Sequence, residues 1–118
     1  MAQAAIRDVG EEGAGPAIDR AHLSRMTFGD KALERELLEL FDRQAALVVA
    51  RMHGTEGATV KVLAHTLKGS AVGVGAIEVA EAAAAIEQGQ DPERLAVLTR
   101  AVDRARTAVA AMLAQSAN

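Results

Sequence analysis

Apolar residues three and four positions apart recur along most of the chain, which is the spacing of amphipathic α-helices. One such stripe consists of Leu33, Leu37, Phe41, Ala45, Val48 and Met52. A second, in heptad-like order near the C-terminus, consists of Leu95, Leu98, Val102, Ala105, Val109 and Met112. Each stripe places one apolar side chain per turn on the same face, so both segments are predicted to be long helices with one buried side.

Capping residues mark where the first two helices begin. Asp19 is the expected N-cap of a short first helix. Thr27 and Asp30 have the spacing of a capping box, with Asp in place of the usual Glu or Gln, and they predict the start of the long second helix. Gly54 suits the C-terminal end of that helix.

Glycine and proline divide the rest of the chain. A third helix is expected over residues 57–72, broken by Gly73 and Gly75, and a fourth, Ala-rich helix over 76–88. Asp91 and Pro92 have the order of an N-cap and a first helical residue, so the last helix should begin there. Short connections between four long helices predict an all-α fold, an antiparallel four-helix bundle with a short additional N-terminal helix packed at one end.

Composition supports this fold and narrows the function. The 118 residues include no Trp, no Tyr and two Phe, which argues against a β-sandwich or barrel. Residues 1–17 are Gly- and Ala-rich and are expected to be a disordered or loosely attached tail, leaving residues 18–117 as one domain. A chain of this length has no room for a kinase or NTPase catalytic domain beside the bundle.

Charge and cysteine content exclude several classes of partner and site. The net charge of −3, without a block of Lys or Arg, weighs against nucleic acid or an anionic membrane as the main partner. The absence of cysteine excludes a disulfide, a zinc–thiolate site and a cysteine nucleophile. No apolar run approaches the roughly 18 residues of a membrane span, and the N-terminus does not resemble a signal peptide. These features predict a cytoplasmic protein.

One histidine lies on the wrong side of its helix to be part of the core. Five apolar residues of the third helix cluster within roughly 50° of one direction: Val60, Leu63, Ala64, Leu67 and Ala71. His65 falls about 140° from that direction, toward solvent. Lys61 and Lys68 lie four residues before and three after it on the same surface, and Gly69 follows one turn later.

This arrangement fits a histidine that accepts phosphate. An exposed neutral imidazole has a nucleophilic nitrogen, and the two ammonium groups offset the charge of a transferred phosphoryl group. Gly69 in mid-helix costs about 1 kcal/mol relative to Ala. Helix propensity gives no reason for that glycine, so steric access of a second protein to His65 is the preferred explanation.

The same residues resemble a known family. His65 to Ala71 (HTLKGSA), followed by Gly75 and Ala76, is similar to the signature H-x-L-K-G-[SA]-[SA] of histidine phosphotransfer (HPt) domains. The segment ELLELF at 36–41 and the acidic end of the fourth helix at 86–87 extend the resemblance, which covers all but the N-terminal tail.

The resemblance implies a role in multistep two-component phosphorelays. His65 would take a phosphoryl group from a receiver-domain aspartate, supplied by a hybrid histidine kinase, and pass it to the receiver of a response regulator. Lys68 would stabilise the phosphoryl charge, and Gly69 would keep His65 accessible. The receiver would supply the aspartate and Mg²⁺, so no cofactor and no kinase activity are expected of this chain, and a monomer is the commoner state of the family.

Several contributions stay open at the level of sequence. Lys61 and Glu87 are possible supporting residues, and Glu87 either accepts a proton from the imidazole or faces solvent. Val62 and Val72, with some apolar side chains of the first two helices, are candidates for docking a receiver. Ser70 is expected to hydrogen-bond a backbone carbonyl.

Other functions are less well supported by the residues. A docking regulator that binds receivers or kinases through the same bundle, with an incidental histidine, is the main alternative. A metal or haem bundle requires inward-facing ligands such as Glu-x-x-His pairs, which the sequence lacks, so no metal site is predicted. A self-sufficient enzyme is disfavoured because there is no nucleotide-binding loop or second catalytic residue.

Overall fold

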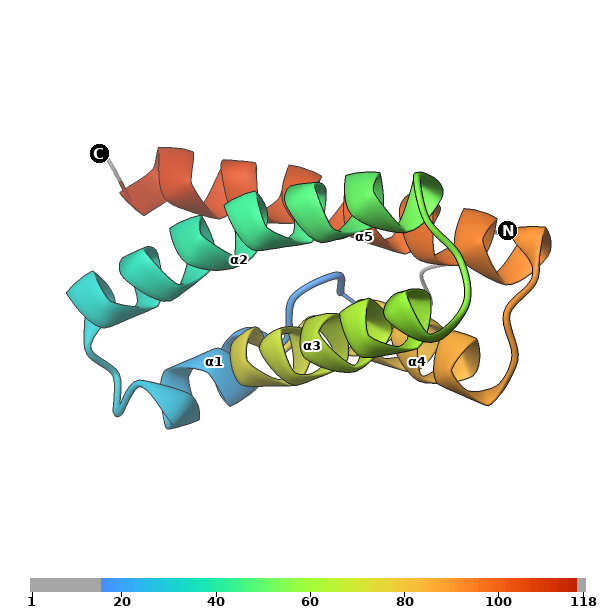
Figure 1. Cartoon of the computed structure of the whole chain (residues 1–118). Helices are drawn as coiled ribbons and strands as arrows, with labels where there is room; N and C mark the ends of the chain where they lie inside the picture. Colours follow the sequence, from blue (N-terminus) through green and yellow to red (C-terminus); the bar gives the residue numbers. More distant parts are fainter. Residues whose placement is uncertain (1–15, 117–118) are drawn as a thin grey trace, which may run out of the picture.

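Residues 16–116 are described by a computed structural model, and within this range the chain is entirely helical, without a strand (Figure 1). The helices are α1 (Arg20–Met26), α2 (Lys31–His53), α3 (Ala58–Val74), α4 (Ile77–Gln88) and α5 (Pro92–Ser116). The predicted all-α class is therefore confirmed. Most of the predicted tail, residues 1–15, lies outside the described residues, and Ile18 already belongs to the core.

The four long helices surround one core. α2 packs against α3 and α5, and α4 packs against the same two helices from the other side. Figure 1 shows α2 and α5 side by side, α3 and α4 opposite them, and α1 at the end of the bundle where α3 terminates. Successive long helices run antiparallel, so the predicted bundle with a short helix at one end is confirmed.

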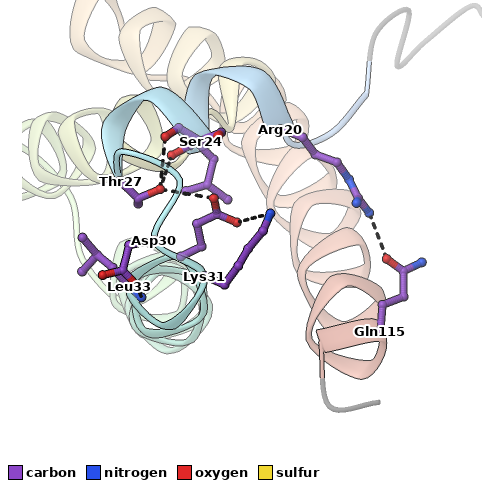
Figure 2. Close-up of polar contacts among 9 residues, drawn as sticks. Arg20, Ser24, Thr27, Asp30, Lys31, Leu33 and Gln115 are labelled. Atoms are coloured by element: carbon purple, nitrogen blue, oxygen red, sulfur yellow. Dashed lines mark hydrogen bonds and ion pairs between the residues drawn. The ribbon is translucent and has the colours of Figure 1, made fainter.

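The connection between α1 and α2 differs from the predicted capping box. Asp30 is the N-cap of α2, because its side chain accepts a hydrogen bond from the backbone N–H of Leu33 at 3.0 Å. The Thr27 hydroxyl instead donates back into α1, to the carbonyl oxygen of Leu23 at 2.9 Å. Figure 2 shows Thr27 turned toward α1 and Asp30 beside Leu33. Thr27 therefore ends α1, and it does not begin α2.

The junction of α3 and α4 also differs from its prediction. α3 continues through Gly73 and ends at Gly75, which has left-handed backbone angles with φ +81°. The N–H of Gly75 bonds the carbonyl of Val72, and the N–H of Ala76 bonds the carbonyl of Ala71 at 2.8 Å. These two bonds form a Schellman motif, which terminates the helix at the glycine that can adopt positive φ. A single helical glycine costs too little to end a packed helix, so Gly73 stays inside α3.

Gly75 also fixes the position of α1. The backbone N–H of Asp19 donates to the carbonyl of Gly75 at 2.8 Å, and a Cβ on Gly75 would lie 2.7 Å from the carbonyl oxygen of Asp19. His22 Nε2 donates to the carbonyl of Val72 at 2.7 Å. α1 is thus bonded to two residues at the C-terminal end of α3.

The core follows the predicted stripes with one exception. Leu38, Phe41, Ala45, Val48, Val49 and Met52 of α2 are buried. Leu37 is only partly buried, and Leu33 is 37 % exposed, so the prediction of Leu33 as a core residue is wrong. The first turn of α2, which contains Leu33, lies at the end of the bundle (Figure 1).

Small residues dominate the contact between α3 and α4. Ala64 and Ala71 of α3 and Ala83 of α4 are fully buried, which lets the two backbones approach closely.

Two ion pairs hold α5 in place: Arg104 bonds Glu78 of α4 at 2.7 Å, and Arg106 bonds Asp42 of α2 at 2.8 Å. In the described part of the chain, no helix combines the length and apolar character needed to cross a membrane.

Candidate functional site

His65 projects from the outer face of α3. Its side chain is 72 % exposed, whereas the adjacent Ala64 and the nearby Leu67 are fully buried. The buried direction of the helix therefore matches the one predicted from the apolar stripe, and His65 lies well away from it. The imidazole therefore projects from a helix whose opposite face is packed in the core.

The imidazole is held by a carboxylate from the neighbouring helix. His65 Nδ1 lies 2.8 Å from Oε2 of Glu87, near the C-terminal end of α4. An ionised carboxylate only accepts hydrogen bonds, so Nδ1 carries the proton in this contact. In the neutral ring the other nitrogen, Nε2, then keeps its lone pair. The geometry thus presents Nε2 as the nucleophilic atom.

Glu87 also holds Lys68. The Lys68 Nζ lies 2.7 Å from Oε1 of Glu87, so one carboxylate bridges the lysine and the histidine. The hydrogen bond from Lys68, followed by the one from His65, lowers the pKa of Glu87 below its ordinary value. Of the two roles that the sequence left open for Glu87, the structure shows the contact with the imidazole. The helical pattern held no signal for it, because the contact depends on how α3 and α4 are aligned.

Lys61 is not part of this cluster. Its side chain is exposed and forms no hydrogen bond or ion pair with any residue in the range 16–116. It lies on the same helix as His65 as a solvated cation, and its supporting role stays a prediction.

Gly69 lies on the open surface beside His65. A Cβ built on Gly69 would meet no atom within 4 Å outside its own helix. Contact with another helix of the described fold therefore does not require glycine here. Ser70, the next residue, donates to the side-chain oxygen of Gln44 on α2 at 2.7 Å, so the expected bond to a backbone carbonyl is wrong.

Exposed apolar side chains lie on the helix of His65 and on the two helices that precede it. Val62 and Val72, the two predicted docking residues, are 64 % and 47 % exposed on α3. We define the apolar rim as these two valines together with the exposed Leu40 and Leu47 of α2 and Met26 of α1. Met26 and Leu40 also line a groove of about 270 Å³ beside Ser70 and Gly73. The two leucines are seven residues apart and off the buried stripe, which is a signal that the sequence analysis used only in general terms.

The described residues offer no evident metal site. Between residues 16 and 116, no group of three or more His, Asp or Glu side chains lies close enough together to bind a metal ion. Glu87 and His65 meet as a pair, with a lysine as the third member of the cluster.

Comparison with known proteins agrees with this site. The sequence model of the Hpt domain family matches residues 31–117. Among solved structures, the chain is similar to the histidine phosphotransferase ShpA from Caulobacter crescentus, with 37 % identity and a TM-score of 0.74. That alignment covers 86 % of this chain and 94 % of ShpA. The comparison with curated proteins gives no match. On the family match, the fold and the signature around His65, this chain belongs to the histidine phosphotransfer (Hpt) domain family.

Proposed function

We propose that this Hpt domain relays a phosphoryl group between receiver-domain aspartates, from a hybrid histidine kinase to a response regulator, through phospho-His65. The observation that carries the proposal is the state of the imidazole. His65 is exposed on a rigid helix, its Nδ1 is engaged by Glu87, and its Nε2 is the nitrogen left for a partner. Family membership supplies the context for this chemistry.

The transfer requires little from this chain beyond a positioned nucleophile. The Nε2 lone pair attacks phosphorus of the aspartyl phosphate, the P–N bond forms, and the P–O bond breaks as the aspartate leaves with the electron pair. The reverse step, onto the aspartate of a second receiver, returns the electrons to Nε2. Phosphoryl transfer depends mainly on positioning and charge stabilisation, so one histidine and nearby cations suffice.

Lys68 and Gly69 have distinct roles in this proposal. The Lys68 ammonium lies at the same carboxylate as the imidazole, from where it can turn toward a phosphoryl group on His65. Gly69 leaves the space over the next turn of the helix open. The receiver would supply the acceptor aspartate and the Mg²⁺ ion that neutralises phosphate oxygens during the transfer.

The apolar rim provides the docking surface in this account. Val62 and Val72 lie on the helix of His65, and Leu40 and Leu47 extend the rim onto α2. Exposed aliphatic side chains around a reactive group favour an apolar patch on the partner, because their burial releases water from both surfaces. A receiver domain seated on this rim would bring its aspartate to Nε2.

The test is phosphoryl transfer from a panel of phosphorylated receiver domains to the wild type and to His65→Gln. Rapid labelling of the wild type by one or more receivers is expected, with no labelling of the variant. His53→Gln is the matched control, because His53 is an exposed histidine that bonds Thr99 on another surface of the bundle. This control should accept phosphate at the wild-type rate.

Binding of the same receivers is measured in parallel. His65→Gln should keep its affinity for the receiver that labels the wild type, since the apolar rim is unchanged. If receivers bind the wild type but none transfers phosphate to it, the relay is refuted and a docking regulator becomes the better account.

A further inference from the structure

We propose that Glu87 is a positioning residue that keeps a proton on Nδ1 of His65 before and after the phosphoryl group arrives on Nε2. This inference deepens the proposed function and rests on it. It assigns a task to the carboxylate beyond holding the ring in place.

The geometry makes Glu87 a hydrogen-bond acceptor for the N–H at Nδ1. Its Oε2 lies 2.8 Å from Nδ1, while its Oε1 is bound by Lys68 at 2.7 Å. In the unphosphorylated protein both oxygens are engaged, so the carboxylate cannot turn away without breaking one contact. The neighbouring Ile86 is buried, which holds this turn of α4 against the core.

The charge of the ring changes during the transfer. Before attack the imidazole is neutral, with its proton on Nδ1. When the P–N bond forms and the P–O bond breaks, the proton stays on Nδ1 and the ring acquires a positive charge. A carboxylate within hydrogen-bond distance stabilises this cation, and the amide of a glutamine at the same place would accept the hydrogen bond without supplying the charge.

The retained proton has a chemical consequence for the second transfer. A phosphorylated ring that keeps its Nδ1 proton leaves as neutral imidazole when the P–N bond breaks. A ring that has lost the proton to water leaves as an imidazolate anion, which is a much poorer leaving group. Glu87 therefore extends to higher pH the form of phospho-His65 that can give up its phosphoryl group.

No other acidic side chain competes for this role among the described helices that pack on α3. The remaining charged or titratable groups of these helices lie on all four of them: Lys61 and Lys68 on α3, Arg20, His22 and Arg25 on α1, Lys31, Glu34, Arg35, Glu36, Glu39, Asp42, Arg43, Arg51 and His53 on α2, and Glu78 and Glu81 on α4. None of the acids of α2 forms an ion pair or hydrogen bond with His65. Glu78 is bound to Arg104, and Glu81 is exposed without a contact to His65. Within residues 16–116, the carboxylate on the imidazole is that of Glu87.

The experiment uses phosphoramidate, which phosphorylates accessible histidines without a receiver domain. Loss of phosphate is followed by mass at about pH 6 and about pH 9, on either side of the ordinary imidazole range. Trypsin cleaves after Lys61 and Lys68, so the peptide 62–68 contains His65 and separates it from His22 and His53. Wild type is compared with Glu87→Gln and with Glu81→Gln, which removes the same charge from the same helix.

At about pH 9, phospho-His65 of Glu87→Gln is expected to lose phosphate about tenfold more slowly than the wild type, since a nearby opposite charge shifts such an equilibrium by about one pH unit at an exposed site. At about pH 6 the rates of phosphate loss of wild type and Glu87→Gln should differ by less than about twofold, because at this pH the phosphorylated ring is largely protonated with or without the carboxylate. Glu81→Gln should match the wild type at both pH values. A purely structural role of Glu87 would not produce a difference confined to alkaline pH.

Nitrogen NMR of the unphosphorylated protein gives an independent readout. The wild type should show His65 predominantly with its proton on Nδ1, and Glu87→Ala should shift the population toward the form protonated on Nε2. Identical pH profiles of wild type and Glu87→Gln, or an equal change in Glu81→Gln, would overturn the inference. These readouts need no receiver, so their failure is distinct from failure of the relay, which would appear as a wild type that no receiver labels.

Discussion

Two glycines of the same helix, Gly69 and Gly75, have opposite relations to the fold. Gly75 ends α3 with φ +81°, and a Cβ there would lie 2.7 Å from a backbone oxygen of Asp19. Gly69 has ordinary helical geometry, and a Cβ there would meet no atom within 4 Å. The first glycine is required by the chain itself. The second is not.

The difference separates structural from functional reasons for a glycine. Glycine inside a helix is less stable than alanine by about 1 kcal/mol, so Gly69 lowers the stability of the bundle without any packing benefit in the described structure. It lies one turn after His65, on the face where a receiver would approach. We therefore predict that the reason for Gly69 lies in a partner, and the following changes test this contrast.

Gly75→Ala is expected to have the largest effect on stability. Alanine disfavours the left-handed conformation and its Cβ would collide with the backbone of Asp19, so a loss of about 2–4 kcal/mol in the free energy of unfolding is expected. Urea denaturation of the whole chain measures it. Gly73→Ala is the control, because Gly73 is helical and a Cβ there meets no atom within 4 Å. Equal free energies of unfolding for Gly75→Ala and Gly73→Ala would show that the fold does not require glycine at position 75.

Substitutions at Gly69 should change stability and transfer in opposite directions. Gly69→Ala is expected to raise the free energy of unfolding by about 0.5–1 kcal/mol, since it removes the helix penalty of glycine. Transfer from a receiver should slow with side-chain size, modestly for Ala and by at least about tenfold for Gly69→Leu, as a clash of about 1.4 kcal/mol would produce. Both quantities are measured on the same preparations. Wild-type transfer by Gly69→Leu would exclude steric access as the reason for this glycine.

The smallest expected effect is a change in the pKa of Glu87, whose carboxylate contacts His65. Its pKa lies below the ordinary value of a glutamate, chiefly because of the hydrogen bond from Lys68 and next because of that from His65. Lys68→Gln should therefore raise the pKa of Glu87 more than His65→Gln does, as measured by carbon NMR of the side-chain carboxyl group. The reverse order would show that the imidazole is the stronger partner.

The sign of the pH dependence follows from this lowered pKa. The ionised carboxylate contributes to stability above the pKa of the unfolded chain, and the contribution disappears as the pH falls through the lower pKa of the folded state. Because the partners of Glu87 reach solvent, with His65 exposed and Lys68 partly exposed, the loss should appear locally, as release of Lys68 and His65 from Glu87, with little change in global unfolding.

Local signals were sufficient to predict most of the fold. The Asp91–Pro92 pair, the glycine at 54 and the apolar stripes identified the helices, because each acts through residues within one or two turns. The errors in helix boundaries occurred where two local signals compete. Thr27 and Asp30 both suit an N-cap, and α1 takes the Thr27 hydroxyl. Gly73 and Gly75 both suit a helix end, and the Schellman motif forms at Gly75.

The candidate site was predictable only in part for a related reason. The outward direction of His65 follows from the periodicity of its own helix. Its contact with Glu87 joins residues on two helices, and it depends on the alignment of α3 with α4. The bond between Ser70 and Gln44 likewise crosses between helices. No spacing within one helix contains that information.

The bond between Asp19 and Gly75 also has a consequence for protein engineering. The turn at Gly75 determines which residue of α4 lies opposite which residue of α3, and therefore that position 87 faces position 65. A chimera that exchanges α4 together with the turn at Gly75 would separate this turn from Asp19, the residue that is bonded to it. A graft of this histidine onto another scaffold should therefore keep the block from Asp19 to Gln88 together. It should also keep α5, because α5 completes the core and forms ion pairs with α2 and α4.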